Sequence, residues 1–135
     1  MRSKSIVLAL AGALLLAASL IACRSEASSE SALTSISWNR AMSNGNPTLA
    51  EFGRGTCIPC KQMKPILEEL AQEYEGKLNV VIVSVDLYAA LTRQYEIMVI
   101  PTQIFLDKDG KEVSRHVGFF PKADIITELA KIGVE

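Results

Sequence analysis

The sequence predicts an α/β domain with a central mixed β-sheet and helices on both of its faces. Short runs rich in Val, Ile and Phe, bounded by Gly, Pro, Asn or Asp, indicate strands. Stretches with apolar residues at spacings of three and four alternate with these runs and indicate helices. A turn ending in Gly separates the last two strands, and a hairpin of this kind adds an antiparallel neighbour to the sheet.

The first strand is predicted at Thr48 to Phe52. This run is mostly apolar and lies between Asn46-Pro47 and Gly53, which are residue types that end regular structure. We therefore expect a buried strand there. A short helix around Trp38 to Ser43 is expected to precede it.

A long amphipathic helix is predicted to follow the strand and to end near Gly76. Its apolar face is formed, at helical spacing, by Met63, Ile66, Leu67, Leu70 and Tyr74. Pro65 lies inside this helix. Because proline lacks an N–H group and its ring crowds the preceding turn, we expect a local kink there.

The second half of the domain is predicted to begin with a strand at Leu78 to Val85. Val and Ile follow one another without interruption in this run, as expected of a strand buried on both faces. The remaining elements are expected to be a short helix at Tyr88 to Tyr95, a strand at Pro101 to Leu106, a turn at Asp107 to Gly110, a partner strand at Glu112 to Val117 and a helix at Ala123 to Ile132.

Residues 1–22 are predicted to be a secretory signal. A basic start with Arg2 and Lys4 precedes an apolar block in which 15 of the 17 residues from Ile6 to Ala22 are apolar, and small residues follow. The end of this block, Leu20-Ile21-Ala22-Cys23, resembles the lipobox of bacterial lipoproteins. That resemblance implies that the Cys23 thiol is acylated and that Cys23 is the first residue of the mature chain.

The mature chain is then expected to consist of a flexible tether at residues 23–34, rich in Ser, Ala and Glu, and a folded domain at 35–135. The protein would be lipid-anchored outside the cytoplasm of a bacterium, on the periplasmic or the outer cell-surface side. The alternatives are a signal cleaved by an ordinary signal peptidase and an uncleaved membrane anchor.

The charge balance excludes one class of partner. The chain has 14 Lys plus Arg against 15 Asp plus Glu, a net charge of −1, with no long run of one sign. Because phosphate binding needs clustered basic residues, we expect no nucleic-acid partner. The sequence also has no nucleotide or flavin motif, so no cofactor is expected.

Two of the three cysteines are predicted to have a chemical rather than a structural role. Three cysteines cannot all pair, and acylation of Cys23 leaves Cys57 and Cys60. A disulfide closing so short a loop adds little stability, so the pair is predicted to serve redox chemistry or to bind a metal. Cys57 is expected at a helix N-terminus, where unpaired N–H groups and the helix dipole stabilise a thiolate. Cys57 is therefore the predicted nucleophile and Cys60 the resolving thiol.

Metal binding is the alternative use of this pair. Zinc needs about four ligands, and beyond the pair the mature domain offers only His116 and the Cys23 expected to be acylated. A haem attachment motif would require His directly after Cys60, where Lys61 stands. Redox chemistry is therefore favoured.

Several motifs in register resemble the thioredoxin family. They are the segment Glu51 to Lys61 with Cys57-Ile58-Pro59-Cys60 inside it, Pro65 five residues after Cys60, Ile100-Pro101-Thr102, and Val117-Gly118 beyond the hairpin. The resemblance covers roughly Ser35 to Glu135. It implies the thioredoxin fold and protein disulfide exchange, with a cis peptide at Ile100-Pro101 beside the cysteines. It also implies a place for Pro101 in the catalytic site and substrate contacts at Ile58, Pro59, Ile100 and Gly118.

Glu51 occupies the position where the family carries a buried acid. A carboxyl group inside an apolar strand would have a raised pKa and could accept the proton of Cys60. The alternative is a solvent-facing glutamate without a role. Two departures from the family stand out: Thr56 replaces the Trp before the first cysteine, and Ile82 replaces a buried Lys near the acid. Without that cation, the pKa of Glu51 should be higher still.

Three other features are expected to take no part in the thiol chemistry. His116 lies in a predicted strand and is expected to be structural or exposed, and Trp38 is expected to pack the first helix. Phe119 and Phe120 follow Gly118, so they are expected either to form an apolar rim facing the substrate or to pack in the core.

The predicted function is an extracytoplasmic thiol–disulfide oxidoreductase that reduces protein disulfides through Cys57 and Cys60. Its expected partners are disulfide-containing proteins, the membrane, and a transmembrane thiol carrier that supplies electrons. Pro59 between the cysteines, and the absence of His there, resembles the reducing members of the family. The alternatives are an oxidase that donates its disulfide, and a binding or metallochaperone module without turnover.

Overall fold

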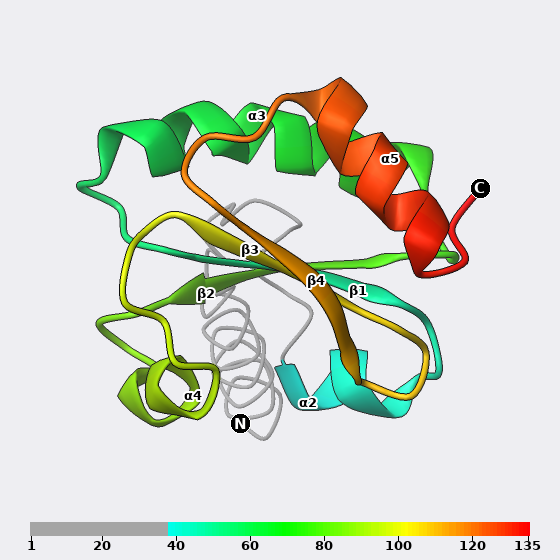
Figure 1. Ribbon diagram of the computed structural model, residues 1–135, viewed down its shortest axis with the longest axis horizontal. Helices are drawn as coiled ribbons and strands as arrows, with labels where there is room; N and C mark the ends of the chain where they lie inside the picture. Colours follow the sequence, from blue (N-terminus) through cyan, green and yellow to red (C-terminus); the bar gives the residue numbers. More distant parts are fainter. Residues whose placement is uncertain (1–37) are drawn as a thin grey trace, which may run out of the picture. The chain divides into compact units, whose positions relative to one another are not determined.

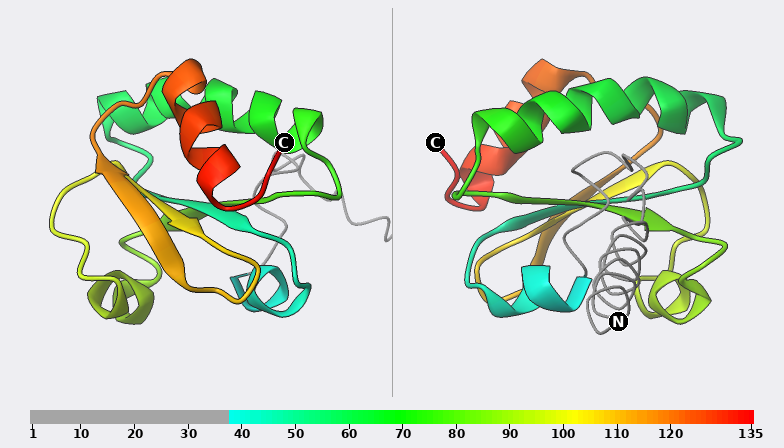
Figure 2. Two further views of the ribbon diagram at one scale, coloured as in Figure 1. Left: turned by 45° about the vertical axis from the view of Figure 1, so that its right-hand side comes forward. Right: turned by 180° about the vertical axis from the view of Figure 1, so that it is seen from behind.

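The computed structural model describes residues 38–135, and in this range a β-sheet lies between two layers of helices (Figure 1). Helices α3 (Ile58–Glu73) and α5 (Lys122–Lys131) cover one face. Helices α2 (Trp38–Ser43) and α4 (Ala89–Gln94) lie on the other face. Two further views show the same layers (Figure 2). The prediction of helices on both faces is confirmed.

The sheet has four strands in the order β2-β1-β3-β4. They are β1 (Thr48–Gly53), β2 (Asn79–Ser84), β3 (Thr102–Leu106) and β4 (Glu112–Val117). The β1–β2 pair is parallel, whereas β3 runs antiparallel to both β1 and β4. The sheet is therefore mixed, as predicted, and β1 lies in its interior directly before the helix that carries the cysteines.

Each face of the sheet has its own hydrophobic core. Beneath α3 and α5 the core includes Leu49, Met63, Leu67, Phe105, Ile125 and Leu129. Beneath α2 and α4 it includes Ala41, Phe52, Val81, Val83, Ile104 and Leu106. Successive residues of a strand point to opposite faces, so β1 places Leu49 and Glu51 toward α3 and Phe52 toward α2. Trp38 packs edge-on against Phe52 and Tyr95, as expected of a residue that packs the first helix.

The predicted elements match the structure, with differences at their ends. α3 ends at Glu73, three residues before Gly76, because the chain turns there: the N–H groups of Lys77 and Leu78 both donate to the Tyr74 carbonyl, and Gly76 has a φ of +78°. Pro65 lies inside α3 without dividing it. In the turn before β4, the Asp107 carboxylate accepts from the N–H groups of Asp109 and Lys111.

The predicted signal, the tether and the lipid attachment at Cys23 fall outside the described residues. Within residues 38–135, the structure has no helix long and apolar enough to cross a membrane.

Candidate active site

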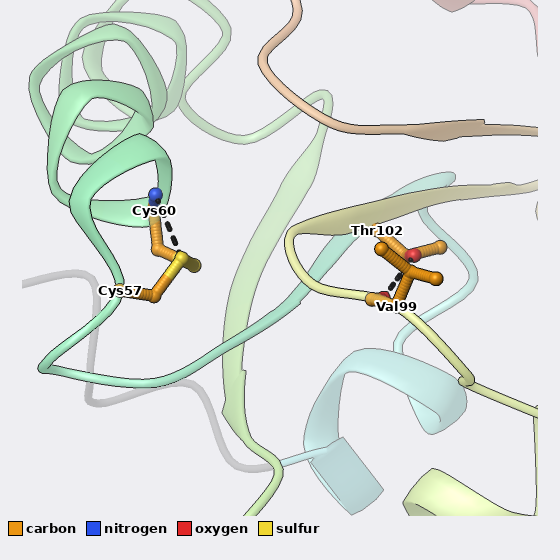
Figure 3. The surroundings of a disulfide bond; sticks show 4 residues. All are labelled: Cys57, Cys60, Val99 and Thr102. Carbon is orange, nitrogen blue, oxygen red and sulfur yellow. Dashed lines mark hydrogen bonds between the residues drawn. A yellow bond between two sulfur atoms is a disulfide. The ribbon is translucent and has the colours of Figure 1, made fainter.

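Cys57 and Cys60 form a disulfide at the start of α3 (Figure 3). Cys57 is the N-cap residue of the helix, as the strand-to-helix junction predicts, and its sulfur accepts a hydrogen bond from the Cys60 N–H at 3.2 Å. Pro59 lies in the first turn, where a proline loses no helical hydrogen bond. The Cys60 N–H and the positive end of the helix dipole therefore both point at the Cys57 sulfur, an arrangement that stabilises a thiolate at a helix N-terminus.

The two cysteines differ in accessibility. Cys57 is half-buried, whereas Cys60 is only 7% exposed. An incoming disulfide can reach Cys57 first, and Cys60 lies behind it against β1. This difference is the one that a nucleophile and a resolving thiol require.

Two contacts of Arg54 hold the loop that presents Cys57. The Cys57 N–H donates to the Arg54 carbonyl at 3.1 Å, and the Arg54 guanidinium pairs with Asp86, after β2, at 2.7 Å. Because this ion pair is exposed, it adds little stability, but it ties the cysteine loop to the end of the neighbouring strand. Nothing in the sequence pattern indicates this pair, because its partners are far apart in the chain.

Glu51 on β1 is 2% exposed, so the solvent-facing alternative is wrong. Burial raises the pKa of Glu51 from 4.5 to about 7. Its direct partner on β2 is Ile82, which supplies no compensating charge. The expectation of a raised pKa for this acid therefore agrees with its environment.

Glu51 and Cys60 border the same cavity, of about 140 Å³. Its wall also contains Ile82 and Ser84 from β2, and Lys61 and Lys64 from α3. Gly53 lies between acid and thiol: a Cβ added there would be 3.1 Å from Cys60 Sγ and 3.4 Å from Glu51 Oε1. The absence of a side chain at Gly53 lets both groups approach the same point, a role that the sequence analysis missed.

The peptide Ile100-Pro101 is cis, as the resemblance implies. The loop before β3 lies in the surroundings of the disulfide, with Thr102 Oγ1 donating to the Val99 carbonyl at 2.7 Å (Figure 3). The Pro101 carbonyl accepts from the Gly118 N–H at 2.8 Å, and this bond joins the loop to the end of β4. Pro101 is buried, and Ile100 and Gly118 are half-buried.

Exposed apolar side chains lie next to these elements. Ile58 is 72% exposed beside Cys57, Val99 is 56% exposed, and Phe119 is 45% exposed after Gly118. Phe120, in contrast, is buried and packs edge-on against Phe105. Phe120 therefore packs in the core, whereas Phe119 is exposed and a substrate contact at Phe119 stays a prediction.

His116 is half-buried on β4, with its ring stacked on Phe120 at a centroid distance of 3.8 Å and its Nε2 3.2 Å from the Phe119 carbonyl. These contacts fit the structural role expected for it. Among residues 38–135, no group of three or more His, Cys, Asp or Glu side chains is placed to hold a metal ion.

Comparison with known proteins agrees with this geometry. Residues 29–131 match the family model described as Thioredoxin. A thioredoxin of Staphylococcus aureus is 43% identical over 83 residues, which cover 62% of this chain and 79% of that protein. The thioredoxin of Staphylococcus aureus strain COL matches to the same extent. This chain therefore belongs to the thioredoxin family.

Proposed function

We propose that the protein is a lipid-anchored, extracytoplasmic thiol–disulfide oxidoreductase that reduces protein disulfides. The thioredoxin domain and the Cys57–Cys60 disulfide at the N-terminus of α3 support thiol–disulfide exchange. The observation that carries the proposal is the graded burial of the pair in front of a buried acid: Cys57 is accessible, Cys60 is behind it, and Glu51 borders the same cavity as Cys60.

In the proposed reaction, the Cys57 thiolate attacks a substrate disulfide and forms a mixed disulfide, and one substrate sulfur leaves as a thiolate. Cys60 then attacks the Cys57 sulfur, which forms the intramolecular disulfide and breaks the bond to the substrate. Glu51 accepts the proton of Cys60, because a carboxyl group with a pKa near neutrality exchanges protons readily at physiological pH. The substrate gains two electrons, and the protein loses them.

Each turnover consumes the dithiol, so an electron donor must restore it. We propose a transmembrane thiol carrier as that donor, since the signal-like N-terminus directs the domain outside the cytoplasm. Pro59 in the first helical turn and the lack of His between the cysteines favour the reducing direction. Ile58, Ile100 and Gly118 are proposed to contact the substrate next to the cis Pro101.

Replacement of single cysteines tests the proposed order of attack. With insulin as the disulfide substrate, reduced Cys60→Ser should accumulate a covalent mixed disulfide with one insulin chain, visible by mass spectrometry and reversed by dithiothreitol. Cys57→Ser is the matched variant and should trap none. Equal trapping by both variants, or trapping by Cys57→Ser alone, would contradict the assignment of nucleophile and resolving thiol.

A further inference from the structure

Gln103 on β3 is fully buried, and neither atom of its side-chain amide has a hydrogen-bond partner in the part of the chain that the structure describes. In the same range, one other buried side-chain atom lacks a partner, and it is Glu51 Oε1. Buried polar groups are normally hydrogen-bonded, because an unpaired one has lost water without replacement. Two such groups of complementary chemistry on neighbouring strands therefore indicate a shared role.

The register of the sheet brings these two side chains together. Glu51 on β1 and Gln103 on β3 are direct partners in the antiparallel pair. Directly opposed residues point to the same face of a sheet, with Cβ atoms about 4.5–5.5 Å apart, which is within reach of their long side chains. On the other side of Glu51 the partner is the apolar Ile82. Gln103 is thus the polar neighbour of the acid in this row.

We propose that Gln103 is a positioning residue for the resolving step: the two side chains are not hydrogen-bonded to each other in the structure, and rotation of the Gln103 amide forms a hydrogen bond that holds the Glu51 carboxyl group toward Cys60. This inference rests on the proposed function, in which Glu51 accepts the Cys60 proton. The Gln103 Nε2–H group donates to the carboxylate before the transfer. After it, the rotated amide presents Oε1 to the new O–H, so the same residue serves both states of the acid.

A hydrogen bond from Gln103 shifts the pKa of Glu51 in one direction, downward. A hydrogen bond from an amide N–H to a carboxylate is charge-assisted and is stronger than one between a carboxylic acid and an amide oxygen. Gln103 therefore stabilises the ionised form of Glu51 and lowers its pKa relative to the same site without an amide. In the structure, where the two groups are not hydrogen-bonded, burial is the cause of the raised pKa of Glu51, and the proposed hydrogen bond limits that rise.

The other titratable and polar groups near Glu51 come from α3, the loop after β1, β2 and β4. Helix α3 contributes Cys60, Lys61 and Lys64 to the cavity wall, and the loop after β1 contributes Arg54. From β2 the neighbours are the uncharged Ile82 and Ser84. On β4 the direct partner of Gln103 is His116, which is titratable and lies one strand further from Glu51. A change at Gln103 leaves all of these groups in place.

The test is a titration of Glu51 in the purified, oxidised full-length protein, labelled with ¹³C at the glutamate side-chain carboxyl carbons and followed by NMR. The Glu51 signal is identified by its loss in Glu51→Gln. In Gln103→Met, which keeps the side-chain length and removes the amide, the pKa of Glu51 should rise by about one unit. Ile104→Val, a buried change on the opposite face of the same strand, is the control and should leave the pKa unchanged.

The second readout is the reaction of the reduced protein with a chromogenic aryl disulfide, which releases one thiol on attack by Cys57 and another on resolution by Cys60. Gln103→Met should slow the second phase by up to about tenfold below the pKa of Glu51, because less carboxylate is present to accept the proton. The first phase should be unchanged. Gln103→Leu should behave like Gln103→Met, which guards against failure of one variant to fold.

An unchanged pKa of Glu51 in folded Gln103→Met overturns the hydrogen bond. A raised pKa with an unchanged second phase overturns the positioning role. If Glu51→Gln itself leaves the second phase unchanged, the proposed function of Glu51 as proton acceptor fails, and the titration result separates that failure from one at Gln103.

Discussion

Glu51 and Ile82 are direct partners across the parallel strands β1 and β2, so the buried acid of this domain has an apolar neighbour on that side. Glu51 is 2% exposed, and burial is the cause of its raised pKa. An acid in this environment is neutral in the folded protein at a pH where it is ionised in the unfolded chain. This difference makes the acid a destabilising element at neutral pH.

The first prediction is a stability profile governed by Glu51. The unfolded chain loses this proton near pH 4.5, and the folded protein loses it near pH 7. The contribution of Glu51 to the free energy of unfolding is therefore highest below about pH 4.5, where Glu51 is protonated in both states, and it falls as the pH rises to about 7. Glu51→Gln should remove this loss and should be more stable than the wild type above neutrality by about 3 kcal/mol. Urea unfolding of the oxidised protein across this pH range measures it.

Glu75→Gln removes an exposed carboxyl group after α3 and serves as the control. It should follow the wild-type profile. Parallel profiles for Glu51→Gln and the wild type would show that the acid does not titrate as its burial requires.

The second prediction concerns Gly53. A Cβ at this position would be 3.1 Å from Cys60 Sγ and 3.3 Å from Cys60 Cβ, which is closer than side chains normally pack. Gly53→Ala should lower the free energy of unfolding by about 1–3 kcal/mol and slow the attack of Cys60 on the mixed disulfide. Gly55→Ala is the matched variant, because a Cβ there meets nothing within 4 Å. If both variants behave alike, close contact at Gly53 does not limit the site.

The third prediction concerns the apolar residues beside the disulfide. Phe119 is 45% exposed, in the segment that Gly118 joins to Pro101. Phe119→Ser should raise the KM for a protein disulfide several-fold, about 1 kcal/mol of lost apolar contact, and leave the reaction with a small aryl disulfide unchanged. Val113→Ser, at a similarly exposed position on β4, is the control. An equal rise in KM for both variants would place the substrate elsewhere.

The fourth prediction concerns the anchor. Cys23→Ser should abolish incorporation of labelled fatty acid in bacterial cells and leave the protein unprocessed by the lipoprotein pathway. Cys60→Ser should retain the label, since only Cys23 follows the lipobox-like segment. Incorporation that persists in Cys23→Ser would exclude this cysteine as the attachment site.

Local sequence patterns were enough to predict the helices and strands and the position of the cysteines. The junction of an apolar strand with an amphipathic helix fixed Cys57 at the helix N-terminus, and the structure has it as the N-cap residue. The end of the helix was less predictable, because the turn at Tyr74 depends on hydrogen bonds from Lys77 and Leu78. Burial of Glu51 also could not be derived from the strand pattern, since it requires α3 to cover that face of the sheet.

Relationships between strands were beyond the reach of the sequence analysis. The pairing of Glu51 with Gln103 depends on the register of two segments more than fifty residues apart. A polar amide in the apolar run Pro101 to Leu106 was the available signal for Gln103, and it acquires meaning only when the partner strand is known. The close approach at Gly53 is similarly a product of how α3 packs on β1.

The central claim is that the Cys57–Cys60 pair works as a reductant, and its reduction potential tests this most directly. Equilibration of the protein with dithiothreitol or glutathione redox buffers, followed by quantification of the dithiol and disulfide forms, gives the value. We predict a potential of about −270 mV, the value typical of thioredoxin. A potential of about −120 mV, typical of a strong periplasmic oxidant, would contradict the reducing direction and make the protein a donor of disulfides.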